Sequence, residues 1–166
     1  MTLKEKIKII VGFIDEIDEN EKRIIKRHQN KTYENLNSEE MIIVARLSQM
    51  LRDYGISFGE NNNRLLWNFL RLYSCSNFEF GELTFGEAMR HCNLEANTKE
   101  SKFKKFIDFP DLLSDYALNL LERQIKFFYK NGLKLNYTNL FYDLMNWKIK
   151  DKPVQMRWIN DYIQKL

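Results

Sequence analysis

Glycine and proline are scarce in this sequence, which has only 6 glycines and 2 prolines among its 166 residues. Sandwiches and barrels of short strands need a glycine, proline or Asn-Gly turn roughly every ten residues. The scarcity therefore excludes the many-turned all-β architectures and predicts a mostly helical chain. Hydrophobic residues make up 44% of the chain, which is enough for the core of one domain or two small ones.

Long apolar runs and cysteines are also lacking. No run approaches the roughly 20 apolar residues that cross a bilayer, and the N-terminal MTLKEKIKII is charged and amphipathic. With only Cys75 and Cys92, we expect reduced, partly buried thiols and no disulfide framework. These features predict a cytoplasmic protein without a secretory signal or a membrane partner.

Recognisable catalytic and metal-binding patterns are missing as well. The histidines, His28 and His91, are far apart in sequence, and adjacent His91 and Cys92 cannot easily point at one ion from a helix. All six glycines are isolated, so there is no Gly-rich phosphate loop. We therefore expect no metal, no cofactor and no enzymatic activity. A helical-bundle enzyme would require a metal or cofactor in the purified protein.

Helical periodicity is what the sequence does contain. The first predicted helix has Leu3, Ile7, Ile10, Ile14 and Ile17 at steps of four and three, and it leads into KRIIKRHQNK. Further helices are predicted in SEEMIIVARLSQMLRDY, RLLWNFLRLY, TFGEAMRHC, NTKESKFKKFIDF, residues 111–131, YTNLFYDLMNW and VQMRWINDYIQKL, whose stripe ends at Leu166. The fold class is therefore all-α, with about eight helices.

Capping signals and loops divide these helices into two groups. Three pairs have capping-box spacing: Asn37 with Glu40, Thr84 with Glu87, and Asn97 with Glu100. The loop SCSNFEFGEL, residues 74–83, is a candidate domain boundary. We expect two small helical bundles, residues 1–93 and residues 94–166, with four helices in each.

Basic residues are unevenly distributed. Residues 1–83 hold 12 Lys and Arg against 13 Asp and Glu, and residues 84–166 hold 14 against 10, which gives net charges of −1 and +4. In the first half, KRIIKRHQNK carries five cations and no acid. Two interpretations stay open for this run: favourable interaction with the dipole at a helix C-terminus, or a patch that faces phosphates.

The second half contains three basic clusters. They are Lys99, Lys102, Lys104 and Lys105 on one predicted helix, Arg123, Lys126 and Lys130 on the next, and Lys148, Lys150 and Lys152 in WKIKDKPVQMRW. One such cluster is typical of a solvated helix face, but three in the same half favour nucleic-acid binding. Because no base-reading motif is visible, we expect contacts to backbone phosphates without sequence preference.

The connector WKIKDKPVQMRW combines two roles by residue type. Trp147 and Trp158 fall on apolar helix stripes, so we interpret them as core residues that fix the angle of a helical hairpin. The lysines between them are then held on a turn where they can meet phosphate. Arg157 either extends this basic edge or pairs with Asp161 one helical turn later.

Taken together, the motifs resemble the CasB family, the small subunit of the type I-E CRISPR effector complex called Cascade. The resemblance is densest in LNYTNLFYDLMNW, the basic connector and VQMRWINDYI, and it extends to VARLSQM, RLLWNFLRLYSCSN, TFGEAM and ESKFKKFI. It implies an all-helical antiviral-defence protein that is not a nuclease. Two copies would lie head to tail in Cascade, beside its backbone and large subunits, its guide RNA and its target DNA.

The resemblance also implies a basic path that holds the displaced DNA strand and stabilises the R-loop. By position it assigns backbone contacts to Arg46, Lys102, Arg123 and Lys150. Two further arginines of the family's N-terminal motif are Ser48 and Gln49 here, and DFPD lacks the arginine of the corresponding family turn. The alternative is a purely structural helical adaptor whose lysines only confer solubility and whose exposed aromatics meet a protein partner.

Overall fold

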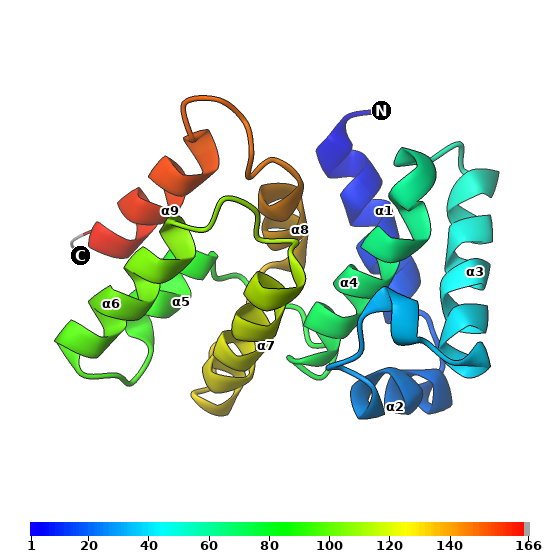
Figure 1. Ribbon diagram of the computed structural model, residues 1–166, viewed down its shortest axis with the longest axis horizontal. Helices are drawn as coiled ribbons and strands as arrows, with labels where there is room; N and C mark the ends of the chain where they lie inside the picture. The colour runs from blue at the N-terminus through cyan, green and yellow to red at the C-terminus, as the bar shows by residue number, and fades with distance from the viewer. Residues whose placement is uncertain (165–166) are drawn as a thin grey trace. The chain divides into compact units, whose positions relative to one another are not determined.

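The computed structural model describes residues 1–164, except for the side chain of Glu60. Within this range the regular elements are helices, accompanied by one isolated β-bridge, so the predicted all-α class is confirmed (Figure 1). Leu166, the last member of the predicted C-terminal stripe, lies outside the described residues. The chain forms two compact units, Met1–Phe78 and Glu79–Leu166. No helix within the described range is long and apolar enough to cross a membrane.

Unit 1 contains four α-helices and two short 3₁₀ helices. They are α1 (Leu3–Asp15), α2 (Glu19–Arg27), η1 (Tyr33–Asn35), α3 (Ser38–Asp53), η2 (Gly59–Asn61) and α4 (Asn62–Ser74). One helix was predicted where α1 and α2 are separate. The break occurs because the Asp18 side chain accepts a hydrogen bond from the Glu21 N–H at 2.8 Å and begins a new helix.

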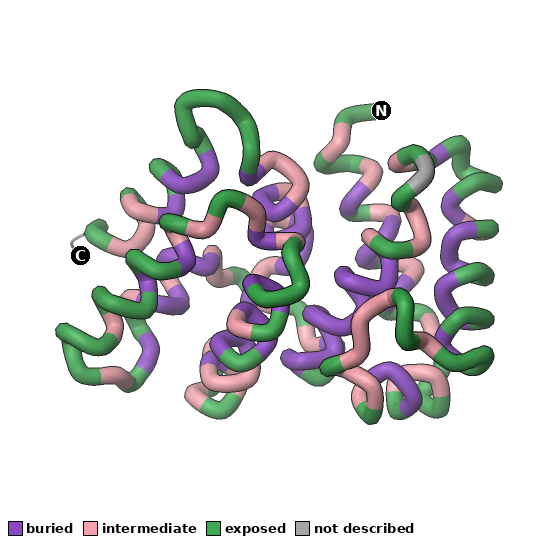
Figure 2. Tube along the Cα trace, in the orientation of Figure 1, coloured by how far each residue is buried: buried purple, intermediate pink, exposed green. Residues whose placement is uncertain are grey.

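The core of unit 1 follows from the apolar stripes of its helices. Ile7, Ile10 and Ile14 of α1 are buried, as are Leu47 and Leu51 of α3. The fourth helix packs against α2 and α3 and is buried throughout residues 66–74. Figure 2 shows α3 with buried residues along one side and exposed residues along the other. This is the pattern of an amphipathic helix that covers a core.

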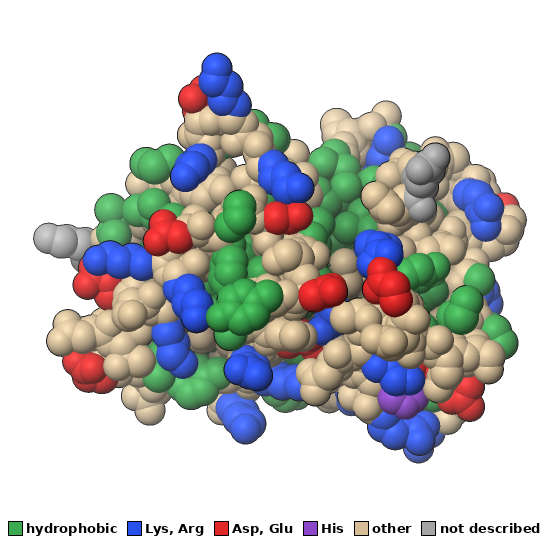
Figure 3. Space-filling model, viewed as in Figure 1, with side chains coloured by type: hydrophobic (Ala, Val, Ile, Leu, Met, Phe, Trp, Pro, Cys, Tyr) green, Lys and Arg blue, Asp and Glu red, His purple; other side chains and the backbone are tan. Residues whose placement is uncertain are grey.

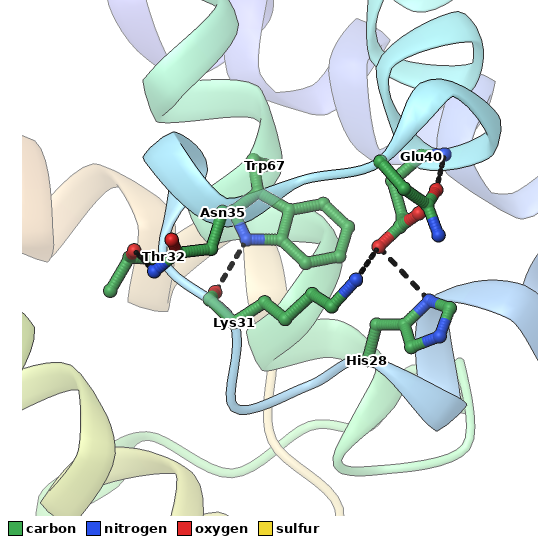
Figure 4. A network of polar contacts seen from close by, with 7 residues as sticks. His28, Lys31, Thr32, Asn35, Glu40 and Trp67 are labelled. Atoms are coloured by element: carbon green, nitrogen blue, oxygen red, sulfur yellow. Dashed lines mark hydrogen bonds and ion pairs between the residues drawn. The ribbon is translucent and has the colours of Figure 1, made fainter.

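The segment between α2 and α3 is attached to both α3 and α4 (Figure 4). The buried Glu40 carboxylate accepts a hydrogen bond from Lys31 Nζ at 2.9 Å, and His28 Nδ1 lies 3.0 Å from the same oxygen. Trp67 Nε1 donates to the backbone oxygen of Lys31 at 2.9 Å. Asn37 caps α3 as predicted, but the Glu40 carboxylate binds Lys31 and His28 where a reciprocal capping box was expected.

Glu40 should make the stability of unit 1 dependent on pH. Burial alone would raise its pKa, but the hydrogen bond from Lys31 and the nearby charges lower it below 4.5. Because the pKa of Glu40 is lower in the folded state, its ionised carboxylate stabilises the fold fully above about pH 4.5. This stabilisation is lost as the pH falls through the folded-state pKa. We expect Glu40→Gln to reduce the free energy of unfolding by about 1 to 2 kcal/mol at about pH 7.

Urea denaturation at about pH 7 and about pH 3 checks this expectation. The difference between Glu40→Gln and the wild type should shrink at the lower pH, because the wild-type carboxyl group becomes increasingly protonated as pH falls toward its lowered pKa. Glu39→Gln removes an exposed neighbouring carboxylate and is the matched control. An equal loss of stability at both pH values would show that the charge of Glu40 is irrelevant.

Unit 2 contains the remaining five helices of the described chain. They are α5 (Phe85–His91), α6 (Ala96–Ile107), α7 (Asp115–Lys130), α8 (Tyr137–Met145) and α9 (Pro153–Ile163). The predicted Thr84 and Glu87 capping box is present at α5. The predicted box that begins with Asn97 is wrong, because Glu95 caps α6 and accepts from the Asn97 N–H. Ser114 caps α7, so this helix begins later than predicted.

Backbone hydrogen bonds place the segment before α5 in unit 2. The Gly81 N–H donates to the Leu135 oxygen at 2.9 Å, and the Asn136 N–H donates to the Leu83 oxygen at 2.8 Å. These bonds flank the isolated parallel bridge between Leu83 and Leu135. The division after Phe78 therefore lies within the loop SCSNFEFGEL, ahead of α5.

Close packing of α5 along α9 also explains why the chain divides after Phe78. The sequence had predicted residues 1–93 as one bundle, but α5 packs in unit 2.

The close approach of α5 to α9 depends on Gly86. A Cβ on Gly86 would lie 2.4 Å from the Trp158 backbone oxygen, which no side chain tolerates without a shift of the helices. We expect Gly86→Ala to lower the free energy of unfolding by about 1 to 3 kcal/mol. Gly12→Ala is the control, because apart from its chain neighbours and the backbone of its own helix no atom lies within 4 Å of the added Cβ.

Urea denaturation of the two glycine variants tests this packing. Gly12 lies in the interior of α1, so its replacement by alanine should leave stability unchanged or raise it by up to about 1 kcal/mol. A Gly86→Ala variant as stable as Gly12→Ala would contradict the close approach of α5 and α9.

Candidate nucleic-acid interface

Basic side chains of α6 and α7 meet at one pocket of unit 2. Lys102 and Lys105 are three residues apart and share a face of α6, and Arg123 comes from α7. The pocket has a volume of about 220 Å³ and is lined by Lys102, Lys105, Phe106, Leu120, Arg123 and Gln124. Figure 3 shows Lys and Arg side chains gathered over α6 and α7 on the face toward the viewer. We call this feature the α6–α7 pocket.

Aromatic packing fixes the orientation of α6. Phe103 stacks on Tyr162 with ring centroids 4.3 Å apart, and Phe106 contacts Phe85 edge-on at 5.2 Å. Both phenylalanines of α6 are buried, whereas Lys102, Lys104 and Lys105 are exposed. The phenylalanine positions therefore hold α6 against the core and leave its lysines at the surface.

The cations of the α6–α7 pocket are available to an external anion. Within the described residues, Lys102, Lys105 and Arg123 form no ion pair with an acidic side chain. The Lys105 ammonium group lies 5.7 Å from the ring centroid of the exposed Tyr116, a cation–π contact that leaves its charge uncompensated. The structure thus brings together three predicted site residues from two helices.

Three other predicted site residues of these helices are not part of this pocket. Lys104 lies 3.9 Å from the Glu100 carboxylate and lines a different pocket beside Phe103. Lys99 Nζ donates to the Arg90 backbone oxygen at 2.8 Å and so connects α6 to α5. Lys126 is half-buried on α7 and is not among the lining residues. Equal spacing on a helix therefore did not give these cations equal surroundings.

The connector between α8 and α9 forms a second basic feature with mixed charge. Lys148, Lys150 and Lys152 line a pocket of about 410 Å³ that also contains Asp108 and Asp151. Lys148 Nζ lies 3.1 Å from a carboxylate oxygen of Asp111. The three lysines are exposed. This cluster presents positive charge beside carboxylates, so it is a weaker anion site than the α6–α7 pocket.

The tryptophans that flank this connector lie in the core, as predicted. Trp147 is 2% exposed and Trp158 is 0% exposed, and their rings meet edge-on at 4.9 Å. Trp158 Nε1 donates to Asp143 Oδ2 at 2.7 Å. Arg157 donates to the other oxygen of Asp143 at 2.7 Å, so its observed partner is on α8, where Asp161 had been considered. Neither tryptophan is placed to stack on a base.

Arg46, the predicted contact in unit 1, has acidic surroundings. It is exposed on α3 and forms an ion pair with Glu21. The pocket that it lines also contains Glu16 and Asp18. A phosphate would be repelled by these carboxylates, so the geometry gives Arg46 less support as a backbone contact than the α6–α7 pocket gives its cations.

The basic run KRIIKRHQNK is largely engaged within unit 1. Lys26 and Arg27 occupy the last turn of α2, and Lys26 hydrogen-bonds to the Asn77 side chain. Lys22 Nζ donates to the Asp15 backbone oxygen at 3.2 Å, and Lys31 binds the buried Glu40. These contacts favour the helix-dipole and tertiary interpretation of the run over a phosphate-facing patch.

Whole-unit charge does not distinguish the two units. Residues 1–78 contain 12 Lys and Arg against 11 Asp and Glu, and residues 79–166 contain 14 against 12, which gives net charges of +1 and +2. The charge asymmetry of the two sequence halves thus depended on assigning Glu79 and Glu82 to the N-terminal half. The basis for an anion site is local placement of cations, as in the α6–α7 pocket.

The cysteines offer no reactive group beside the basic residues. Cys75 and Cys92 are both buried and are not joined in a disulfide. Burial raises the pKa of Cys92, although the charges of Lys99 and Lys102 oppose the shift. A raised pKa keeps the thiol protonated and therefore a poor nucleophile. Within the described residues, no group of three His, Cys, Asp or Glu side chains is placed to hold a metal ion.

Gln124 is a polar pocket residue that the sequence analysis did not single out. It lies at a core-facing position of α7, on the stripe that includes Ala117, Leu121 and Phe128, and it is 5% exposed. A polar residue on an apolar helix stripe is a recognisable signal in the sequence. A neutral amide adds nothing to the local density of lysine and arginine, which was the signal that predicted phosphate contacts.

One comparison with known proteins gave a match. A family model described as CRISPR-associated protein Cse2 matches residues 69–162. The match begins in α4 and extends into α9, so it includes the α6–α7 pocket and the connector. Neither the curated proteins nor the solved structures gave a match.

Proposed function

The chain belongs to the CRISPR-associated protein Cse2 family, which confirms the predicted CasB family, and from this premise we propose that it is the non-catalytic small subunit of a type I-E Cascade complex. In this role it binds the nucleic-acid backbone without sequence preference and stabilises the displaced DNA strand of the R-loop. Its partners are the backbone and large subunits, the guide RNA, the target DNA and a second copy of itself. Its place of action is the cytoplasm.

The observation that supports backbone binding is the α6–α7 pocket. Three cations from two helices line it, and none is neutralised by an acidic side chain within the described residues. Lysine and arginine attract phosphates through charge and release counterions from the nucleic acid, so such binding needs no particular base sequence. Lys102 and Arg123 are also two of the positions that the family resemblance assigns to backbone contacts.

Weak contacts are sufficient for this task. Guide RNA reads the target by base pairing, and the RNA–DNA hybrid that forms is about as stable as the DNA duplex that it replaces. A few phosphate contacts to the displaced strand can therefore shift this exchange toward the open R-loop. Because the contacts are electrostatic, their contribution should fall steeply with salt.

Two measurements test the proposal. Mass spectrometry of the material that co-purifies with the protein from its native host should identify a guide RNA and other Cascade subunits. Fluorescence anisotropy with a labelled single-stranded DNA should show binding at low salt that weakens steeply as salt is added and is equal for unrelated sequences. Absence of both a guide RNA complex and low-salt binding would overturn the proposal.

A structural adaptor without nucleic-acid contact is the second candidate, and exposed apolar side chains favour it. Met41 and Ile42 of α3 are 53% and 62% exposed, and Met156 of α9 is 52% exposed. Large apolar groups at a surface are typical of protein-binding sites. If this function alone were correct, assembly into a complex would survive, and R-loop stability would not change, when the pocket cations are removed.

A further inference from the structure

The α6–α7 pocket contains a buried hydrogen-bond donor without a partner. Gln124 is 5% exposed, and within the described residues its Nε2 forms no hydrogen bond. Leaving such a donor unsatisfied costs about 1 to 3 kcal/mol. An acceptor from a bound molecule in the pocket that Gln124 lines would remove this cost.

The chemistry of the other lining side chains determines which ligand fits. Lys102, Lys105 and Arg123 can donate hydrogen bonds but cannot accept them. Phe106 and Leu120 are apolar. Every side-chain partner that faces a ligand here, apart from the Gln124 oxygen, is therefore a donor or an apolar surface. A group with several acceptor oxygens and negative charge fits such a pocket, whereas a cation does not.

We propose that Gln124 is a phosphate-binding residue and that the α6–α7 pocket holds one backbone phosphate of a single-stranded nucleic acid. Gln124 Nε2 donates to a phosphate oxygen, and Lys102, Lys105 and Arg123 neutralise the charge. The identity of the phosphate as part of a nucleic acid rests on the proposed function. The pocket then provides one defined point of attachment, which exposed lysines on a flat surface do not provide.

A neutral donor and a cation leave different signatures in a salt titration. Loss of one lysine–phosphate contact lowers the slope of log K against log salt by about 0.7 for a single strand. Loss of a neutral hydrogen bond weakens binding but releases no counterion, so the slope stays unchanged. We therefore expect Gln124→Leu to weaken binding about tenfold with an unchanged slope.

The experiment measures anisotropy of a labelled single-stranded DNA across a salt series for the wild type, Gln124→Leu, Gln124→Glu and Lys102→Ala. Gln124→Glu replaces the donor by an acceptor that repels phosphate, so it should weaken binding more than Gln124→Leu. Gln49→Leu makes the same change on α3 of unit 1, at a residue that does not line the pocket, and should bind as the wild type does. Inorganic phosphate, compared with chloride at equal ionic strength, tests whether the free anion competes for the same pocket.

Stability measurements separate this role from a structural one. Since Gln124→Leu removes an unsatisfied donor, its free energy of unfolding should equal or exceed that of the wild type. A destabilised Gln124→Leu variant, or one that binds DNA normally, overturns the inference. Normal binding by Gln124→Leu together with weak binding by Lys102→Ala would leave the proposed function intact. A wild-type protein that does not bind DNA at low salt would instead overturn the proposed function.

Discussion

Replacement of Lys102, Lys105 and Arg123 together by alanine is expected to weaken binding of single-stranded DNA by roughly a hundredfold at about 0.1 M salt. The three side chains line one pocket and have no acidic partner within the described residues, so their charge is directed to an external anion. Each phosphate contact to a single strand contributes about 0.7 to the slope of log K against log salt. The triple variant should therefore also lose about two units of this slope. Anisotropy titrations across a salt series measure both effects.

A matched control separates local placement from total charge. Lys4, Lys6 and Lys8 are three lysines of α1 in unit 1, and their replacement by alanine removes the same net charge. We expect this control to change affinity severalfold at most, because long-range attraction between exposed charges is screened by salt. Equal losses of affinity and slope in the two triple variants would refute the α6–α7 pocket as the binding site.

The pattern of helices could be predicted well from the sequence because helical periodicity and capping are local. The apolar stripes of α3, α4, α7 and α9 each repeat within a few turns, and the Thr84 cap involves residues three apart. The division of the chain could not be predicted as reliably. It depends on the pairing of Leu83 with Leu135 and on the close approach of α5 to α9, and neither contact leaves a signal within a short window of sequence.

The sequence predicted that the candidate site consists of basic residues on these helices, but it did not predict which of those residues line the pocket. Local density of lysine and arginine indicated the helices that carry cations, yet Lys99 and Lys104 of α6 are engaged by Arg90 and Glu100. Which cation remains available depends on side chains that tertiary packing brings beside it. For the same reason the partner of Arg157 was missed, since Asp143 comes from another helix.

Trp158→Ala is expected to lower the free energy of unfolding of unit 2 by about 3 to 5 kcal/mol, the usual cost of removing a fully buried aromatic side chain. The Trp158 ring stacks on Phe85 at 4.3 Å and meets Trp147 edge-on, so its loss leaves a cavity where α5, α8 and α9 meet. It also leaves one oxygen of the buried Asp143 without the indole donor.

Trp158→Phe is the matched comparison. It keeps a stacking ring and loses only the hydrogen bond, so we expect its free energy of unfolding to fall by about 1 to 2 kcal/mol. Urea denaturation followed by near-ultraviolet circular dichroism compares the two, and a loss below about 1 kcal/mol for Trp158→Ala would mean that the connector hairpin does not depend on this residue.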